Sequence, residues 1–136
     1  MEREIPSSGK VIVGDLRPLV SVVDDDESVR ESLPDLLNEL GYAARAFYSA
    51  EEFLASDCVN RTRCLVLDVG LPGMSGPQLL LELKRLGREV PIVFITANAD
   101  DTVRLRLLEQ GAVAYLLKPF SDTALHQALD AALGVS

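Results

Sequence analysis

The sequence predicts an α/β fold, a doubly wound, five-stranded parallel sheet with the strand order 2-1-3-4-5. Three observations favour it. Short apolar runs alternate five times with segments of helical periodicity, as repeated βα units do. The run at 64–67 is apolar without interruption, which is typical of a strand buried on both faces of a parallel sheet. Right-handed crossovers then leave few topologies open to five such units.

The first βα unit combines a strand at 19–23 with a helix at about 29–40. Apolar residues recur in the helix at the spacing of one buried face. Gly41 follows the last of them and predicts the helix end. Pro34 lies inside this helix, where it should remove one backbone hydrogen bond and bend the element.

The second unit is expected to be short. A strand at 42–48 leads into Ser49 and Glu52, which we interpret as a capping box that opens a helix ending at Ala55. The third strand follows at 64–68 and ends in a Gly/Pro-rich turn.

The third helix is predicted at 77–86. Its inward-facing residues are expected to be Leu79, Leu80, Leu83 and Leu86. The remaining elements are expected to be a strand at 91–95, a helix at 102–110, a strand at 114–117 and a helix capped by Ser121.

Length and composition predict one globular domain. The chain has 136 residues, of which 48% are hydrophobic and 25% charged, as in an ordinary domain with a single core. We expect a mostly irregular tail at 1–18 and the domain at 19–136. No apolar run approaches a membrane span and no secretory signal begins the chain, so we expect a cytoplasmic protein without membrane contact. The net charge of −8 argues against direct nucleic-acid binding.

Polar residues collect where four of the predicted strands end. Residues 24–26 are aspartates that follow the first strand, Asp68 ends the third, Thr96 follows the fourth and Lys118 follows the fifth. The carboxyl ends of parallel strands share one edge, so these side chains should lie together. Carboxylates in one pocket repel each other unless a cation sits among them, and oxygen ligands favour Mg²⁺. A hydroxyl and an ammonium group beside the metal suit a transferring phosphoryl group.

These motifs resemble those of response-regulator receiver domains of bacterial two-component signalling, over about residues 19–133. The motifs are the acidic cluster after the first strand, Asp68 with the Leu71–Gly76 turn, Thr96-Ala97, Tyr115, and Lys118-Pro119-Phe120. The resemblance implies a flavodoxin-like (CheY-like) fold and a phosphoacceptor switch. A sensor histidine kinase would supply the phosphoryl group, and a downstream protein or output domain would respond, with a homodimer as one form of response. The turn and the 116–120 stretch are similar to receivers fused to helix-turn-helix regulators, so the chain is expected to be stand-alone or part of such a regulator.

The resemblance also implies the metal site. Asp68 would be the phosphoacceptor and a metal ligand. Asp24 and Asp25 match the paired acids that hold Mg²⁺, and the backbone carbonyl of Gly70 would be a further ligand. Asp26 falls outside this set and is expected to be a helix-start acid.

Three more positions take roles from the resemblance. Thr96 would donate its hydroxyl to a phosphoryl oxygen, and Lys118 would pair with Asp68 and then with the phosphoryl group. Tyr115 matches the aromatic residue that turns inward as Thr96 moves. The face of the fourth helix, fifth strand and fifth helix would then rearrange. The Lys118–Pro119 bond is typically cis in such proteins.

Two other functions stay open at this stage. A receiver fold could serve as an adaptor that is never phosphorylated. The Asp24-x-Asp26-x-Ser28 spacing also resembles, faintly, a haloacid-dehalogenase-type phosphatase, in which Asp24 would be the nucleophile.

Several charged residues outside this constellation are expected to have no part in the chemistry. Asp100 and Asp101 are expected to cap the fourth helix, and His126 to lie on a helix surface. The residues expected on solvated faces are Lys84, Arg85, Arg88, Arg104 and Arg106.

Overall fold

The computed structural model describes residues 16–134, and its five strands form one all-parallel sheet in the order β2-β1-β3-β4-β5. The strands are β1 Leu19–Val23, β2 Ala43–Phe47, β3 Thr62–Asp68, β4 Ile92–Thr96 and β5 Ala114–Leu117. The helices are α1 Glu27–Glu39, α2 Ala50–Leu54, α3 Gly76–Arg85, α4 Asp101–Glu109 and α5 Asp122–Leu133. The predicted fold class and strand order are confirmed. The tail predicted at 1–18 lies almost entirely outside the described residues.

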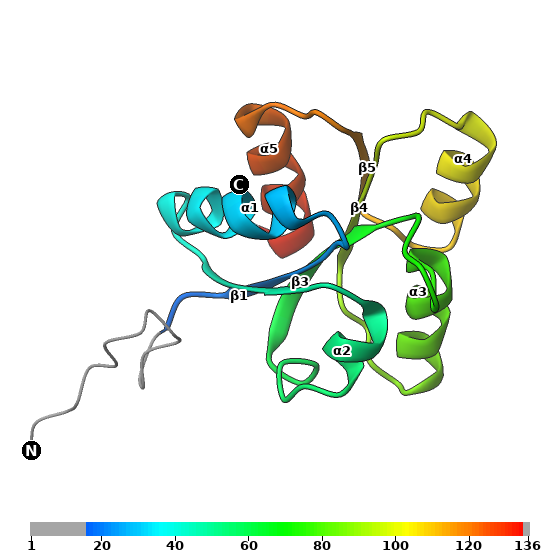
Figure 1. The fold of residues 1–136 in the computed structure, drawn as a ribbon, viewed down its shortest axis with the longest axis horizontal. Helices are drawn as coiled ribbons and strands as arrows, with labels where there is room; N and C mark the ends of the chain where they lie inside the picture. Colours follow the sequence, from blue (N-terminus) through cyan, green and yellow to red (C-terminus); the bar gives the residue numbers. More distant parts are fainter. Residues whose placement is uncertain (1–15, 135–136) are drawn as a thin grey trace, which may run out of the picture.

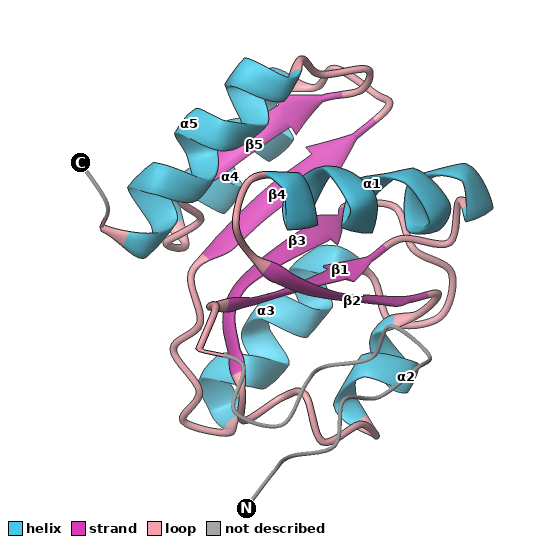
Figure 2. Cartoon of the chain, turned by 90° about the vertical axis from the view of Figure 1, so that its left-hand side faces the viewer, coloured by secondary structure: helices cyan, strands magenta, loops and turns pink. Residues whose placement is uncertain are grey.

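Helices cover both faces of the sheet, with α1 and α5 on one side and α2, α3 and α4 on the other (Figures 1 and 2). Two separate apolar cores result. Successive residues of the central strands alternate between them: Leu65 and Leu67 of β3 pack with the α2–α3 side, while Cys64 and Val66 pack with the α1–α5 side. Both faces of β3 are therefore buried, as its uninterrupted apolar run predicts.

The strand register brings the carboxyl ends of the central strands to one level. Val23 of β1 lies opposite Leu67 of β3, and Asp68 lies opposite Ile95 of β4. Thr96 in turn lies opposite Leu117 of β5. The residues that follow or end β1, β3, β4 and β5 therefore meet at one edge of the sheet.

Each helix begins at a side chain that accepts a backbone hydrogen bond, as orphan N–H groups require. These N-cap residues are Asp26, Ser49, Ser75, Asp100 and Ser121. Asp100 is the cap of α4, whereas Asp101 is its first helical residue. The prediction of a capping box at α2 is wrong in one respect: Glu52 accepts from the backbone N–H of Tyr48 rather than that of Ser49. A reciprocal capping box does occur at α3, between Ser75 and Gln78.

One prediction about a helix interior needs correction. Leu86 follows the end of α3 and is 48% exposed, because the chain leaves the helix before this residue can turn inward. Leu79, Leu80 and Leu83 are buried as expected. Pro34 lies within α1, which continues on both sides of it. Among residues 16–134, no helix has the length and apolar character needed to cross a bilayer.

A buried pair of hydroxyl groups lies where the β1–β3 register shifts. Thr62 is opposite Leu19, but Cys64 is opposite Val20, so one residue of β3 is extra at this point. The Thr62 hydroxyl donates to the Cys58 carbonyl oxygen at 2.7 Å and lies 2.6 Å from the Ser21 hydroxyl. These bonds satisfy polar groups that the core would otherwise leave unpaired.

Candidate functional site

Asp24 is the fully buried acid at the end of β1. Its backbone N–H donates to the Phe47 carbonyl oxygen of β2, so the backbone keeps sheet-like pairing beyond the strand. One carboxylate oxygen, Oδ1, accepts from the backbone N–H of Asp26 at 2.9 Å. Arg30 of α1 donates to the Asp24 carbonyl oxygen at 3.0 Å. The main chain on either side of the carboxylate is thereby fixed.

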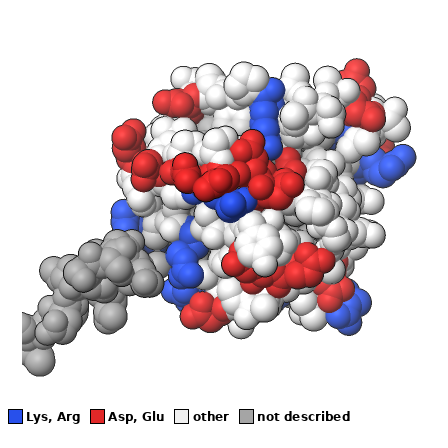
Figure 3. Space-filling view, in the orientation of Figure 1, with Lys and Arg blue, Asp and Glu red and all other residues white. Residues whose placement is uncertain are grey.

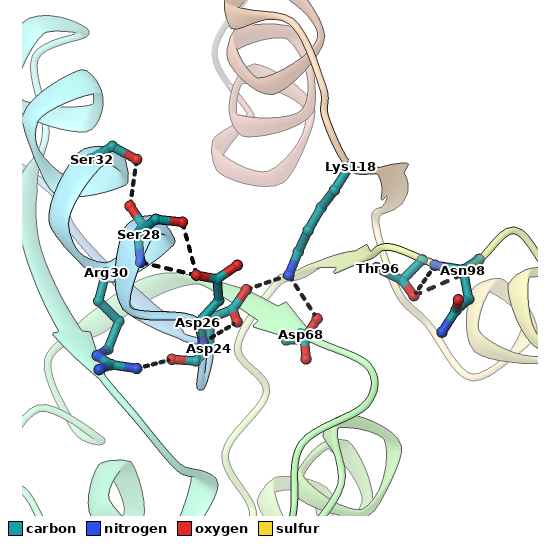
Figure 4. A network of polar contacts seen from close by, with 9 residues as sticks. All are labelled: Asp24, Asp26, Ser28, Arg30, Ser32, Asp68, Thr96, Asn98 and Lys118. Carbon is teal, nitrogen blue, oxygen red and sulfur yellow. Dashed lines mark hydrogen bonds and ion pairs between the residues drawn. The ribbon is translucent and has the colours of Figure 1, made fainter.

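The side chain of Lys118, which follows β5, contacts the acid that follows β1 and the acid that ends β3 (Figure 4). Its ammonium nitrogen Nζ lies 2.7 Å from Asp24 Oδ2 and 3.1 Å from Asp68 Oδ1. The backbone N–H of Lys118 donates to the Thr96 carbonyl oxygen, which ties the end of β5 to that of β4. The peptide bond to Pro119 is cis, as expected. The pairing with Asp68 follows the prediction, and the shorter contact with Asp24 adds a second partner.

The charges of this network perturb two of its groups. Burial raises the pKa of Asp68, and the nearby Asp24 carboxylate raises it further, against the opposing effect of Lys118. Burial acts to lower the pKa of Lys118, but the bonds to Asp24 and Asp68 outweigh it and the pKa is raised. Lys118 is therefore a firmly charged cation, and the ionised form of Asp68 depends on it.

Three carboxylates converge closely enough to share one cation. Asp24, Asp25 and Asp68 each offer one ligand oxygen, and these atoms lie within 4.8 Å of one another. Two of the acids are buried and Asp25 is exposed, so the cluster opens to solvent on one side. An all-oxygen donor set that carries excess negative charge fits a hard divalent cation. Gly70, the predicted carbonyl ligand, is exposed two residues after Asp68, and a side chain there would meet no atom within 4 Å.

The hydroxyl of Thr96 belongs to a separate network in this structure (Figure 4). Thr96 is 5% exposed. Its Oγ1 accepts from the backbone N–H of Asn98 at 3.1 Å and lies 3.4 Å from the Asn98 carbonyl oxygen. The half-buried Tyr115 also donates its hydroxyl to that carbonyl, at 3.4 Å. Thr96 and Tyr115, which the resemblance couples, therefore meet at one backbone group, the Asn98 carbonyl oxygen.

The response regulator receiver domain profile matches residues 20–130, most of the chain. The chain belongs to this family. Its members are signalling switches of two-component systems, and the cluster of Asp24, Asp25 and Asp68 fits their phosphoacceptor site and its divalent metal.

Relatives and solved structures agree with this assignment. Nodulation protein W of Bradyrhizobium diazoefficiens is 46% identical over 116 residues, 85% of this chain and 51% of that protein. Transcriptional regulatory protein FixJ of Azorhizobium caulinodans is 39% identical over 117 residues, 86% of this chain and 56% of that protein. The crystal structure of FixJ-N aligns with a TM-score of 0.77 and 37% identity over 86% of this chain and 94% of that one. The receiver domain thus spans about half the length of the curated relatives it matches.

One residue that the sequence interpretation missed is Glu51, which holds the loop of the receiver domain that follows Asp68. Its Oε2 accepts from the backbone N–H of Met74 at 2.8 Å, 23 residues away. Gly73 adopts a left-handed φ of +70° beside it, and a Cβ there would lie 2.8 Å from the same carboxylate. Gly76 packs against the backbone of Asp68 so closely that a Cβ would overlap the Asp68 carbonyl oxygen. The path from Asp68 to α3 is thus held from two sides.

Acidic side chains form a band across the receiver domain over α1 (Figure 3). Four exposed acids recur at every fourth position of this helix: Glu27, Glu31, Asp35 and Glu39. Beside them, a groove of about 800 Å³ runs between α1 and residues 118–122. Its floor includes Leu33, Leu36 and Phe120, and Asp35, Glu39 and Asp122 lie along it. The groove reaches Lys118, so it opens next to the site.

Proposed function

We propose that Asp68 accepts a phosphoryl group from a phosphohistidine of a sensor histidine kinase, in a reaction that requires Mg²⁺. The observation that carries the proposal is the position of Lys118 between Asp24 and Asp68, beside a cluster of three carboxylates. Such a site combines a nucleophile, a fixed cation and oxygen ligands for a metal, the three things a phosphoryl transfer needs.

The reaction balances with the groups at hand. A carboxylate oxygen of Asp68 forms the new bond to phosphorus as the bond from phosphorus to the kinase histidine nitrogen breaks. The electron pair of the broken bond stays on the imidazole, which then takes up a proton. Lys118 holds Asp68 in its ionised form before the transfer and stays close to the phosphoryl oxygens after it.

Asp24, Asp25 and Asp68, with the Gly70 carbonyl, would hold the metal. Bound Mg²⁺ supplies positive charge against the phosphoryl oxygens. Asp24 also keeps Lys118 in place, and the exposed Asp25 leaves this side of the cluster open to an incoming phosphodonor.

The signal would pass through Thr96 and Tyr115. A phosphoryl group on Asp68 offers acceptor oxygens that compete with the Asn98 backbone for the Thr96 hydroxyl. Tyr115 binds the same carbonyl, so displacement of Asn98 removes the contact that holds its hydroxyl in place. The α4–β5–α5 face would shift in consequence, because the two states differ in these contacts.

The partners follow from the same site. The groove beside Lys118 and the acidic row of α1 suit a kinase helix that carries basic residues next to its phosphohistidine. We propose residues 19–136 as the receiver domain and a DNA-regulating output domain, or a separate downstream protein, as its target. The relative named a transcriptional regulatory protein supports the first. We also propose that phosphorylation leads the domain to form a homodimer and that the protein acts in the cytoplasm.

The test is Mg²⁺-dependent labelling by acetyl phosphate and by a phosphorylated histidine kinase, followed by intact-mass measurement. The wild type should gain one phosphoryl group, and Asp68→Asn should gain none. Asp57→Asn, which changes an exposed acid paired with Arg61, is the matched control and should label normally.

Mapping the labelled aspartate separates the alternatives. A label on Asp24 would favour the phosphatase interpretation, although both carboxylate oxygens of Asp24 are already bonded. A folded wild-type protein that accepts no label with Mg²⁺ present would favour the adaptor and contradict the proposal.

A further inference from the structure

Arg30 is the only basic residue of α1, and its guanidinium bonds to a backbone group rather than to an acid. Asp26 and Glu27 lie four and three residues before it, at spacings that favour ion pairs on a helix. Within residues 16–134, however, no carboxylate pairs with Arg30. The Asp26 carboxylate accepts instead from the backbone N–H and the hydroxyl of Ser28. The half-buried Arg30 side chain reaches the Asp24 carbonyl oxygen, to which Nη1 donates at 3.0 Å.

The Asp24 carbonyl group belongs to the peptide unit that joins two of the proposed metal ligands. Its oxygen and the N–H of Asp25 lie in one rigid plane, because the peptide bond is planar. On the other side of the Asp24 Cα atom, the backbone N–H donates to the Phe47 carbonyl oxygen of β2. Both peptide units around Asp24 are therefore held, and their orientations determine where Asp25 begins.

Asp25 depends on its backbone more than the other two acids of the cluster do. It is exposed, whereas Asp24 and Asp68 are buried and are also held by Lys118. Its ligand oxygen nevertheless lies within 4.8 Å of theirs. Like charges at such distances repel each other, so the chain itself must hold Asp25 there until a cation binds. In Figure 4, Arg30 and Lys118 approach Asp24 from opposite sides, one at its carbonyl oxygen and the other at its carboxylate.

We propose that Arg30 is a positioning residue of the metal site. Its guanidinium fixes the peptide unit between Asp24 and Asp25 and thereby holds the Asp25 carboxylate at the cation that the cluster shares. A guanidinium suits this task, since its charge is permanent and a charged donor forms a stronger hydrogen bond than a neutral one. Partners that orient metal ligands typically contribute about 10- to 100-fold in metal affinity. Because the metal site is part of the proposed function, this role requires that Mg²⁺ binds there.

The positive charge of Arg30 allows positioning to be told apart from electrostatics. A cation beside the carboxylates repels Mg²⁺, so removing the charge alone would tighten metal binding. Loss of the bond to the Asp24 carbonyl oxygen would instead weaken it. Arg30→Met removes both the charge and the donors, and we expect its dissociation constant for Mg²⁺ to rise by about tenfold or more. Arg30→Lys keeps the charge on a shorter side chain, so its affinity should lie between those of Arg30→Met and wild type.

The experiment is a titration of MgCl₂ into the 136-residue chain labelled with ¹³C and ¹⁵N, followed by NMR. The backbone amides of Asp25 and Gly70 report the metal and give the dissociation constant. Before metal is added, the Asp24 carbonyl carbon should shift upfield in Arg30→Met, because the hydrogen bond to its oxygen is lost. A change in fold stability alone would not move this signal selectively.

Arg85→Met is the matched control. Arg85 is exposed and pairs with Glu82 of its own helix, so this variant loses the same charge and should keep the wild-type affinity. Metal-free amide spectra establish that each variant is folded, and Arg30→Lys carries the test if Arg30→Met is not.

Asp25→Asn shows whether Arg30 acts through Asp25. In this background Arg30→Met should not weaken Mg²⁺ binding further, because the carboxylate that Arg30 holds is already gone. An equal loss in the two backgrounds would mean that Arg30 acts on another part of the site, and would overturn the proposal.

The wild-type titration separates this role from the proposed function. If Mg²⁺ causes no saturable shifts in the wild type, the metal site and the role of Arg30 fail together. If the wild type binds Mg²⁺ and a folded Arg30 variant binds it as tightly or more tightly, the metal site stands and the positioning role fails.

Discussion

The ammonium nitrogen of Lys118 lies 2.7 Å from a carboxylate oxygen of Asp24, 94 residues earlier in the chain. Asp24 is fully buried, and within residues 16–134 the other hydrogen bond to its carboxylate comes from one backbone N–H. Lys118 is thus the counter-charge for two acids at once, since it also lies 3.1 Å from Asp68. The stability of the domain and the proposed phosphoryl transfer therefore both depend on the ammonium group of Lys118.

Replacing Lys118 with Met should leave the buried Asp24 carboxylate unpaired. We expect the free energy of unfolding to fall by about 3 kcal/mol in the presence of a chelator. Urea denaturation followed by circular dichroism measures it. Arg85→Met is the control, because it removes an exposed ion pair whose attraction is screened by solvent. Equal losses in the two variants would mean that the Lys118–Asp24 contact contributes no more to the free energy of unfolding than an exposed ion pair does.

Mg²⁺ should stabilise the wild-type domain, because it relieves repulsion among Asp24, Asp25 and Asp68. At tenfold excess over its dissociation constant the gain is about 1.4 kcal/mol, and a chelator should reverse it. Asp68→Asn should be more stable than wild type without metal, since the raised pKa of Asp68 shows that its ionised form is disfavoured in the fold. Thermal melts with and without Mg²⁺ test both statements. A metal response that is undiminished in Asp68→Asn would place the ion elsewhere.

The positions of Asp24, Asp68 and Lys118 could be predicted because each follows a recognisable strand, and parallel strands share one carboxyl edge. The relative distances among these three side chains could not be predicted. Whether Lys118 lies closer to Asp24 or to Asp68 depends on side-chain packing between segments far apart in sequence. The Thr96 hydroxyl is a similar case, because its bond to Asn98 belongs to one loop conformation.

The errors have physical causes of the same kind. Leu86 continues the apolar period of α3, but helical periodicity does not say where the helix ends. The role of Glu51 was not predicted, because no local pattern indicates a bond to a backbone N–H 23 residues away. The N-cap at Ser121 was predictable from its residue type, whereas the cis peptide at Pro119 was expected from the resemblance to receiver domains.

Glu51→Ala should loosen the loop after Asp68, because the Met74 N–H loses its acceptor. We expect the Met74 amide to exchange with solvent about tenfold faster, the equivalent of one hydrogen bond. Glu51→Gln keeps an acceptor oxygen and should stay near wild type. Glu52→Ala is the matched control, since Glu52 binds the Tyr48 N–H instead. An unchanged Met74 exchange rate in Glu51→Ala would show that the loop is held by Gly73 and Gly76 alone.

Thr62→Val should destabilise the fold although it keeps the side-chain shape. The change leaves the Ser21 hydroxyl without its partner in the core, whereas the Cys58 carbonyl oxygen still accepts from the backbone N–H groups of Arg61 and Thr62. The expected loss is about 1–3 kcal/mol. Adding Ser21→Ala to Thr62→Val should recover part of it, because one orphan group disappears. Urea denaturation of the two variants measures the difference, and an additive loss would contradict the proposed coupling.

Stability should fall at alkaline pH in part through Cys64. Burial raises the pKa of this thiol from the ordinary 9.0 to about 12. The folded state therefore binds the proton more tightly than the unfolded state, and the contribution is complete below pH 9 and is lost as pH rises toward 12. At pH 10 the loss is about 1.4 kcal/mol relative to neutral pH. Cys64→Ala should lack this component, so urea denaturation at both pH values should show a smaller pH-dependent loss than wild type. A difference between the two proteins that stays constant with pH would mean that the Cys64 thiol ionises in the folded state as readily as in the unfolded chain.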